Sequence, residues 1–259
     1  MKPLLQVTNL SKAFGGNKVL EQIDFVVGQG EILGLLGPNG SGKSTLLNAI
    51  SGFTPVDVGE IIIDQQRIDR LPTYQLVGKG IARTFQLPAM PEKMSVMEVV
   101  LAAGIRHHGF WSSVLPLPGA RAAEREDREK AVALLDELLL SKVRDLPAAA
   151  LSGGQKKLLG IACALMGSPK LLMLDEPMAG VHPNLRNEIV DTLKRLNRGG
   201  LSLMIIEHDM HFIRDICHRC IVLDRGHIVA TCRPDELTHN AKVLEAYLGT
   251  MAKPLPEAV

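Results

Sequence analysis

The chain has 259 residues, of which 46% are hydrophobic, and its formal net charge is +1. This length suits one or two domains, and the apolar content suits an α/β protein with a buried parallel sheet. The nearly balanced charge argues against general nucleic-acid binding. No run of apolar residues is long enough to predict a membrane-spanning helix.

The first part of the chain favours strands. Residues 4–27 and 59–63 contain short β-type segments separated by turns, and we expect them to form an antiparallel sheet. Strand and helix patterns alternate in residues 31–52, 80–86 and 156–232, which is typical of a parallel-sheet core.

The middle of the chain is different. Residues 87–150 hold helical patterns and predict an α-helical insertion. In residues 124–130 the charges alternate in sign and nearly cancel, which is typical of a solvated helix face. We expect residues 250–259 to form a flexible tail.

Residues 37–45, GPNGSGKST, fit the P-loop pattern G-x-x-x-x-G-K-[ST]. The apolar residues before them predict a buried strand, and a helix is expected to begin near Lys43. Glycines let backbone N–H groups point inward at phosphate oxygens, and a helix N-terminus favours anions. Lys43 would reach the β- and γ-phosphates, and the Ser44 hydroxyl would bind Mg²⁺. A turn without a ligand is the weaker alternative.

Residues 151–155, LSGGQ, form what we call the signature segment. Ser152 is a good N-cap for the helix that follows, and Gly153 and Gly154 expose N–H groups at its start. The segment therefore predicts a second anion site, although an ordinary capped helix would give the same pattern.

Residues 171–174 are apolar and predict another short buried strand, which Pro177 stops. Asp175 at its end would hold Mg²⁺, and Glu176 is placed to accept a proton from an attacking water molecule. Two solvated loop acids are the alternative interpretation.

Together, GPNGSGKST, LSGGQ and LLMLDEP resemble the ATP-binding subunit of an ABC transporter, and the resemblance covers about residues 4–249 as a single ATPase domain. It implies an α/β fold: a P-loop NTPase (RecA-like) core with an antiparallel β subdomain and an α-helical insertion. The segments KAFGG and GIARTFQ and the long insertion are most similar to the branched-chain amino acid importer type.

The resemblance implies three groups of site residues, with ATP and Mg²⁺ as the bound species. Those implied in catalysis are Glu176, His208 and Gln86. The metal ligands would be Ser44, Gln86 and Asp175. The nucleotide would be bound by Phe14, Gly37, Pro38, Asn39, Gly40, Ser41, Gly42, Lys43, Ser44, Thr45, Ser152, Gly153, Gly154 and Gln155. A core Phe, an exposed Gln and a structural His remain alternatives for Phe14, Gln86 and His208.

The family also implies partners. Two ATPase subunits, identical or paralogous, would face head to tail so that each signature segment closes on the ATP of the other chain. Integral membrane permease subunits would dock on the helical insertion, and a periplasmic solute-binding protein would act indirectly. We expect the chain to be peripheral, at the cytoplasmic face of the inner membrane, and to have no nucleic-acid partner.

Rival functions share most of these motifs. An ATPase of lipid or lipopolysaccharide export would have every catalytic residue, and the long insertion disfavours it. A non-transport ABC ATPase usually carries two ATPase domains or a coiled coil. A soluble P-loop kinase would need an acceptor site in place of LSGGQ.

Two local features leave alternatives open. His182 stands where most family members carry an Asp, so it is either part of a backbone turn before Pro183 or a pH-sensitive interface residue. Cys217 and Cys220 form a C-x-x-C that is either a metal or redox site or a pair of packed thiols.

Overall fold

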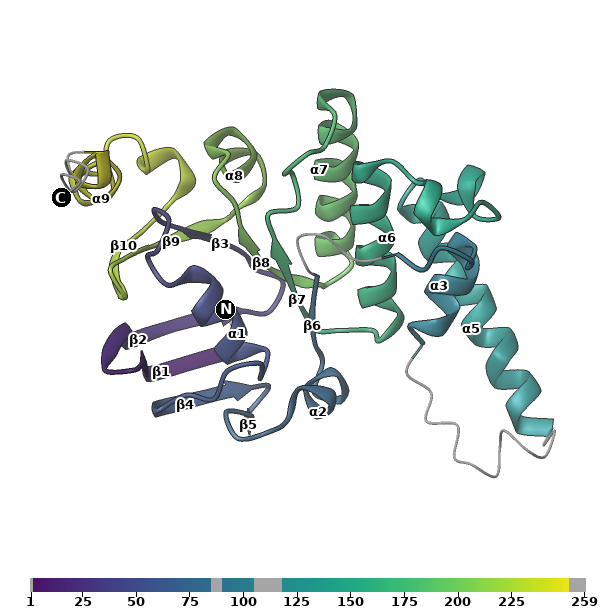
Figure 1. Ribbon diagram of the computed structural model, residues 1–259, viewed down its shortest axis with the longest axis horizontal. Helices are drawn as coiled ribbons and strands as arrows, with labels where there is room; N and C mark the ends of the chain where they lie inside the picture. The colour runs from purple at the N-terminus through teal and green to yellow at the C-terminus, as the bar shows by residue number, and fades with distance from the viewer. Residues whose placement is uncertain (1, 85–89, 105–117, 252–259) are drawn as a thin grey trace, which may run out of the picture.

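The computed structural model describes residues 2–84, 90–104 and 118–251. Two sheets and a helical arm make up the molecule: an antiparallel sheet and a larger sheet lie side by side, and α3 and α5 project away from both (Figure 1). The α/β fold expected from the motifs is confirmed.

The antiparallel sheet has the strand order β2-β1-β4-β5. Gly15 and Gly16, with φ of 54° and 85°, form the two-residue turn between the first two strands. Such turns match the twist of a hairpin, and glycine adopts their positive φ at little cost. The strands are β1 (Pro3–Phe14), β2 (Asn17–Gly28), β4 (Val58–Ile63) and β5 (Gln66–Arg67).

The larger sheet has six strands in the order β10-β9-β3-β8-β7-β6. Five of them run parallel, so their carboxyl ends meet at one edge. They are β3 (Ile32–Leu36), β6 (Ile81–Arg83), β7 (Leu171–Asp175), β8 (Ser202–Ile206) and β9 (Arg219–Asp224).

The edge strand β10 (His227–Cys232) differs from the parallel core expected over residues 156–232, because it pairs antiparallel with β9. Arg225 and Gly226 join the two strands and have φ of 43° and 81°. A two-residue connection is too short for the crossover that a parallel pair needs, so a hairpin is the only outcome.

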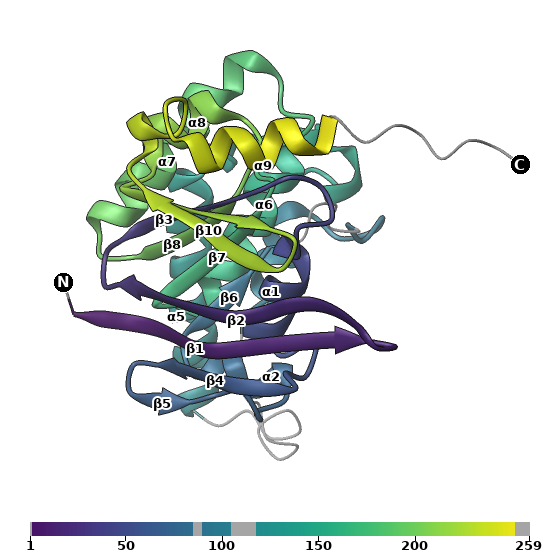
Figure 2. The ribbon, with the colours of Figure 1, turned by 90° about the vertical axis from the view of Figure 1, so that its left-hand side faces the viewer.

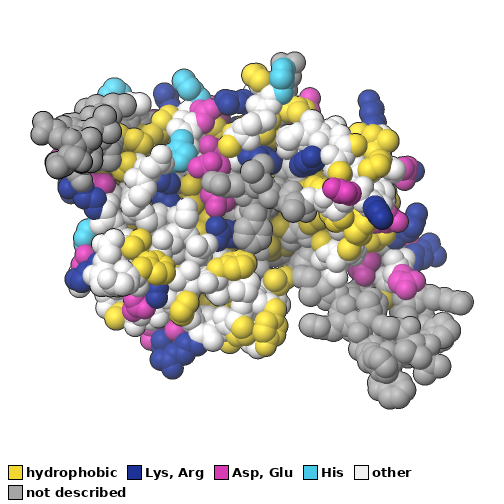
Figure 3. Space-filling view, viewed as in Figure 1, with side chains coloured by type: hydrophobic (Ala, Val, Ile, Leu, Met, Phe, Trp, Pro, Cys, Tyr) yellow, Lys and Arg dark blue, Asp and Glu magenta, His cyan; other side chains and the backbone are white. Residues whose placement is uncertain are grey.

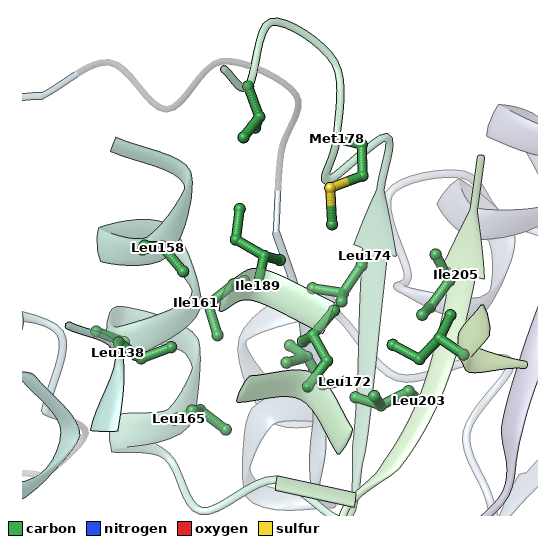
Figure 4. Close-up of a cluster of buried hydrophobic side chains, with 14 of the residues drawn as sticks. Leu138, Leu158, Ile161, Leu165, Leu172, Leu174, Met178, Ile189, Leu203 and Ile205 are labelled. Carbon is green, nitrogen blue, oxygen red and sulfur yellow. The ribbon is translucent and has the colours of Figure 1, made fainter. Parts of the chain in front are cut away.

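The central strands are buried on both faces and separate two hydrophobic cores. Because side chains alternate along a strand, Leu172 and Leu174 face one core and Leu171 and Met173 face the other. The first core packs the sheet against α6 and α7, as Figure 4 shows around Leu174, Ile189 and Ile161. The second packs it against α1 and the antiparallel sheet.

Helices flank the larger sheet on both sides. In Figure 2 the antiparallel strands lie below it, and α6 to α9 lie toward the opposite side. The helices outside the projecting arm are α1 (Lys43–Ile50), α2 (Thr73–Gly78), α6 (Gly153–Met166), α7 (Pro183–Arg198), α8 (Met210–Ile216), η3 (Pro234–Glu236) and α9 (Ala241–Met251). The projecting arm contains α3 (Val96–Ala102), α5 (Pro118–Glu137), η1 (Ser141–Val143) and η2 (Ala148–Ala150).

Among the described residues, no helix combines the length and the apolar character that crossing a lipid bilayer requires.

Candidate nucleotide site

The P-loop leaves β3 at Leu36 and enters α1 at Lys43, as the sequence predicts. Gly37 and Gly42 have φ of 146° and 107°. A Cβ atom on Gly37 would come within 2.0 Å of the Leu223 carbonyl oxygen, and one on Gly42 would lie 2.9 Å from that of Val19. Only glycine therefore fits at these two positions, and the loop curls tightly enough to point its N–H groups inward.

Lys43 is buried beneath this curl. Its Nζ donates hydrogen bonds to the carbonyl oxygens of Gly37, at 2.8 Å, and Pro38, at 2.9 Å. Burial lowers the pKa of Lys43, and the nearby carboxylates of Glu176 and Asp175 oppose that shift. The ammonium group is thus held against its own loop, where an arriving phosphate would compete with two neutral carbonyls for it.

A pocket of about 230 Å³ opens at the carboxyl edge of the parallel strands. It joins the P-loop, which follows β3, to the ends of β7 and β8, at the carboxyl edge of the sheet where α/β proteins bind ligands. In Figure 3, acidic side chains with a histidine beside them lie left of centre in the upper half of the face. The pocket is lined by Val19, Asn39, Gly40, Gly42, Lys43, Ser44, Thr45, Asp175, Glu176, Ile206 and His208.

Glu176 and His208 meet in this pocket. The Nε2 atom of His208 lies 3.1 Å from Oε1 of Glu176, and both side chains are part-exposed. Glu176 has a φ of 48°, a left-handed conformation that is unusual for a side chain with a Cβ. The turn re-aims its carboxylate from the strand end toward the pocket, and backbone strain of this kind is typical of functional sites.

Asp175 is tied to the helix that follows the P-loop. Arg83 at the end of β6 donates to Oδ2 of Asp175 at 3.0 Å, and both side chains are 8% exposed. The same guanidinium donates to Oδ1 of Asn48 at 2.6 Å and to the hydroxyl of Ser51 at 3.2 Å. Arg83 was not among the predicted site residues, although a charged residue at the end of a buried strand is a signal that could have found it.

The residues present fit a magnesium ion. Ser44 and Asp175 both line the pocket, and a hydroxyl and a carboxylate are hard oxygen donors of the kind that Mg²⁺ prefers. Gln86, the third predicted ligand, lies outside the described residues.

The signature segment is not part of this pocket. The Ser152 hydroxyl accepts a hydrogen bond from the Gln155 N–H at 3.3 Å, and the Gln155 Oε1 accepts one from the Ser152 N–H at 3.0 Å. This capping box confirms Ser152 as the N-cap of α6. Gly153 lies beside the carbonyl of Gly180, on the loop after Glu176. Within one chain, the structure does not bring the signature residues to the P-loop.

Phe14 is not a core residue. Its side chain is 51% exposed at the tip of the β1–β2 hairpin, and the ammonium group of Lys12 lies 5.2 Å from the centre of its ring. Asp57 holds Lys12 in place at 2.7 Å and also accepts the Ala13 N–H. The interpretation of Phe14 as a core residue is therefore wrong, and one face of its ring is accessible to a ligand.

The C-x-x-C pair is buried. The hydrogen bond to Cys220 and then burial raise the pKa of the Cys217 thiol well above its ordinary value, which makes that thiol unreactive. Both sulfur atoms lie 3.2 Å from where a Cβ on Gly34 would stand, so they fill the space beside that glycine. The described residues contain no group of three His, Cys, Asp or Glu side chains suited to a metal ion.

His182 is exposed and directly precedes α7, which begins at Pro183 as predicted. Its carbonyl accepts the Leu185 N–H at 2.9 Å, inside the turn that starts the helix. Gly180, with a φ of 71°, bends the chain two residues earlier.

The family model, the similar sequences and the similar solved structure all point to the same protein family. The ABC transporter family model matches residues 20–179. The chain is 37% identical to a probable branched-chain amino acid transport ATP-binding protein, LivG, of Archaeoglobus fulgidus, with 95% of each chain covered. It is 35% identical to the lipopolysaccharide export system ATP-binding protein LptB of Escherichia coli K12, with 95% of this chain and 97% of LptB covered.

A solved structure agrees in fold over nearly the whole chain. The ADP conformation of MJ1267, an ATP-binding cassette of an ABC transporter, superimposes with a TM-score of 0.84 at 35% identity. The match covers 96% of this chain and all of that one.

Proposed function

The chain belongs to the ABC transporter family of ATP-hydrolysing subunits, and from this premise we propose that it powers solute import through a membrane permease. The proposed solute is a branched-chain amino acid or a related small molecule, as the name of the LivG relative indicates. The observation that carries the proposal is a single pocket that holds Lys43, Asp175, Glu176 and His208 and lacks the signature segment.

ATP binding follows from the loop. Backbone N–H groups of residues 37–45 and the N-terminus of α1 would surround the phosphates, and Lys43 would exchange its two carbonyl partners for them. Phe14 offers an exposed ring for the adenine base. Ser44 and Asp175, with Gln86, would hold Mg²⁺, which offsets phosphate charge when bound.

Hydrolysis is assigned to Glu176 and His208. The Glu176 carboxylate reaches the pocket and can accept a proton from a water molecule that attacks the γ-phosphate. His208, 3.1 Å away, fixes the direction of that carboxylate and lies where it can contact the γ-phosphate. The ion pair between Arg83 and Asp175 keeps the neighbouring strand end rigid.

The signature segment would serve a second chain. It is outside the pocket of its own chain, so a head-to-tail pair is the arrangement that places two N–H-rich helix ends on each ATP. The partner is a second copy or a paralogue.

Besides the helical insertion, permease docking would use the surface around α2 and the end of α1. An apolar hollow of about 150 Å³ there is lined by Phe53, Leu76, Val77, Ile81 and Arg83 among others. Phe53 is 53% exposed, and nearby Tyr74 on α2 is 75% exposed. Large aromatic side chains rimming a hollow favour a protein partner, which would hold this chain peripherally at the cytoplasmic face of the membrane.

Lipopolysaccharide export is the second candidate, because LptB is nearly as similar as LivG. The length of the insertion is weak evidence against it, since the match covers 97% of LptB.

The test is to isolate this chain with its permease from detergent-solubilised membranes. Reconstituted with that permease and a solute-binding protein, it should drive ATP-dependent uptake of leucine into vesicles. Phe53→Asp should abolish co-purification and leave ATP hydrolysis by the chain alone intact. Co-purification with a lipid-extracting permease, without leucine uptake, would instead support the export candidate.

A further inference from the structure

Glu207 is a buried carboxylate with no function assigned above. It follows β8 directly, and only 4% of it is exposed. Its Oε1 accepts the Met178 N–H at 2.6 Å, and its Oε2 accepts the His208 N–H at 3.0 Å. A buried charge persists only where hydrogen bonds satisfy it, and here each oxygen has its own backbone donor.

The two donors belong to the segments whose side chains meet in the nucleotide pocket. Met178 is two residues beyond Glu176, and His208 is the residue whose Nε2 contacts Glu176. A backbone bond from the Glu176 N–H to the Ile206 carbonyl, at 2.9 Å, joins the same segments. Glu207 therefore holds the loop after β7 against the loop after β8, on either side of the contact between Glu176 and His208.

Lys157 extends this arrangement to the signature helix. It lies on α6, two residues beyond Gln155, and its Nζ donates to the carbonyl oxygen of Glu176. Burial lowers the pKa of Lys157, and the charge of Glu207 is the foremost of those that oppose it. The start of α6 is thus connected, within one chain, to the backbone that carries Glu176.

We propose that Glu207 is a positioning residue for ATP hydrolysis: it fixes the contact between Glu176 and His208 and, with Lys157, couples that contact to the signature helix. The proposal rests on the catalytic assignments of Glu176 and His208 made above. When the signature helix contacts the ATP of the partner chain, it would then influence the position of Glu176 and His208 in its own chain.

The proposal requires two acceptor oxygens at position 207. Glutamine has nearly the same shape but only one acceptor, so Glu207→Gln would turn an amide N–H toward either Met178 or His208. Either the bond to Met178 that holds the loop after β7, or the bond that orients the His208 backbone, would be lost while the side-chain volume stays the same.

Glu31 provides a matched control. It is 6% exposed, accepts the Gly28 N–H at 2.7 Å and is paired with Arg219 at 2.8 Å, at the start of β3 away from the pocket. Glu207→Gln and Glu31→Gln both perturb a buried carboxylate bonded to the backbone, so both should lower the melting temperature. Only Glu207→Gln should lower kcat, by about tenfold or more, as expected when a reacting group is misplaced. The ATP dissociation constant should stay within about twofold in both variants, since neither touches the phosphates.

A double-mutant cycle with His208→Ala separates positioning from loss of stability. If Glu207 acts through His208, then adding Glu207→Gln to His208→Ala slows hydrolysis no further. A kcat of Glu207→Gln close to that of Glu31→Gln, or fully multiplicative effects with His208→Ala, would overturn the proposal. Should Glu207→Gln not fold, Glu207→Asp compared with Glu31→Asp makes the same test. A failure of the catalytic assignments would appear separately, as undiminished turnover in Glu176→Gln.

Discussion

Two helices of this protein begin with glycines and an anion-binding pattern, yet their first turns are built differently. At α1 the N-cap is Gly42, in a left-handed conformation with no side chain to cap the helix, and the end opens into the pocket. At α6 the N-cap is Ser152, whose hydroxyl and N–H are both bonded to Gln155. The first helix start is open to a phosphate group, and the second is partly bonded to its own side chains.

This difference agrees with the proposal that, of the two phosphate-directed motifs, the P-loop holds the nucleotide of its own chain. The P-loop has no internal substitute for the anion except the Lys43 ammonium folded over it. The signature helix has a partial internal substitute, because its capping box bonds the N–H groups of Ser152 and Gln155. We therefore expect ATP binding to be a property of the single chain and hydrolysis to be a property of the pair.

The largest expected effect is on the rate of ATP hydrolysis and comes from a residue that belongs to neither helix start, Glu176. Glu176→Gln should retain ATP binding but slow hydrolysis by at least about 100-fold, the low end for loss of a general base. The variant should accumulate as an ATP-bound dimer on a sizing column. Glu129→Gln, on the exposed surface of α5, is the control and should turn over normally. Turnover of Glu176→Gln within a few-fold of the natural protein would remove Glu176 from this role.

The next largest effect is a loss of ATP affinity, and it concerns only the start of α1. Lys43→Ala removes a charge from the β- and γ-phosphates, and hydrogen bonds to charged groups are worth about 1.5–3 kcal/mol. ATP affinity measured by calorimetry should therefore fall by about tenfold or more. Lys156→Ala, on the signature helix, should leave the affinity of the isolated chain as it is. An unchanged affinity for Lys43→Ala would contradict the P-loop assignment.

A smaller effect concerns the capped helix start. Ser152→Ala breaks the capping box and should cost roughly 1 kcal/mol of unfolding free energy, the usual value for an N-cap. Urea denaturation of the isolated chain measures this loss, and nucleotide affinity should not change. An unchanged unfolding free energy would show that the capping box between Ser152 and Gln155 does not stabilise α6 in the free chain.

The smallest effect depends on pH and concerns α8, the helix after His208. Burial tends to raise the pKa of Asp209, but bonds from the Phe212 and His211 N–H groups and the Arg186 side chain outweigh it, so this pKa is lowered. Its charge therefore stabilises the fold above the ordinary Asp pKa of about 3.9, and that contribution is lost as pH falls through the lower folded pKa.

The variant Asp209→Asn keeps a capping side chain and removes the charge. Its deficit in unfolding free energy should be roughly 0.5 kcal/mol near neutral pH, because the paired side chains are part-exposed, and should disappear in acid. A deficit that is independent of pH would show that the charge contributes nothing.

The sequence predicted the structure correctly where the residues that determine it lie within a few positions of one another. The glycines of the P-loop, the cap at Ser152 and the helix start at Pro183 all depend on local geometry. Arg83 and Glu207 were missed because their partners lie 92 and 29 residues away in the chain, where no spacing rule reaches. The antiparallel direction of β10 was missed although Arg225 and Gly226 form a recognisable two-residue turn.

The central claim is that the signature segment acts on the nucleotide of the other chain. Ser152→Arg should leave ATP binding intact and block hydrolysis, and Lys43→Ala should be inactive for want of bound ATP. Mixing the two inactive variants creates pairs in which the intact P-loop of one chain faces the intact signature segment of the other. We predict that the mixture hydrolyses ATP well above either variant alone. A mixture as inactive as its components would contradict the claim.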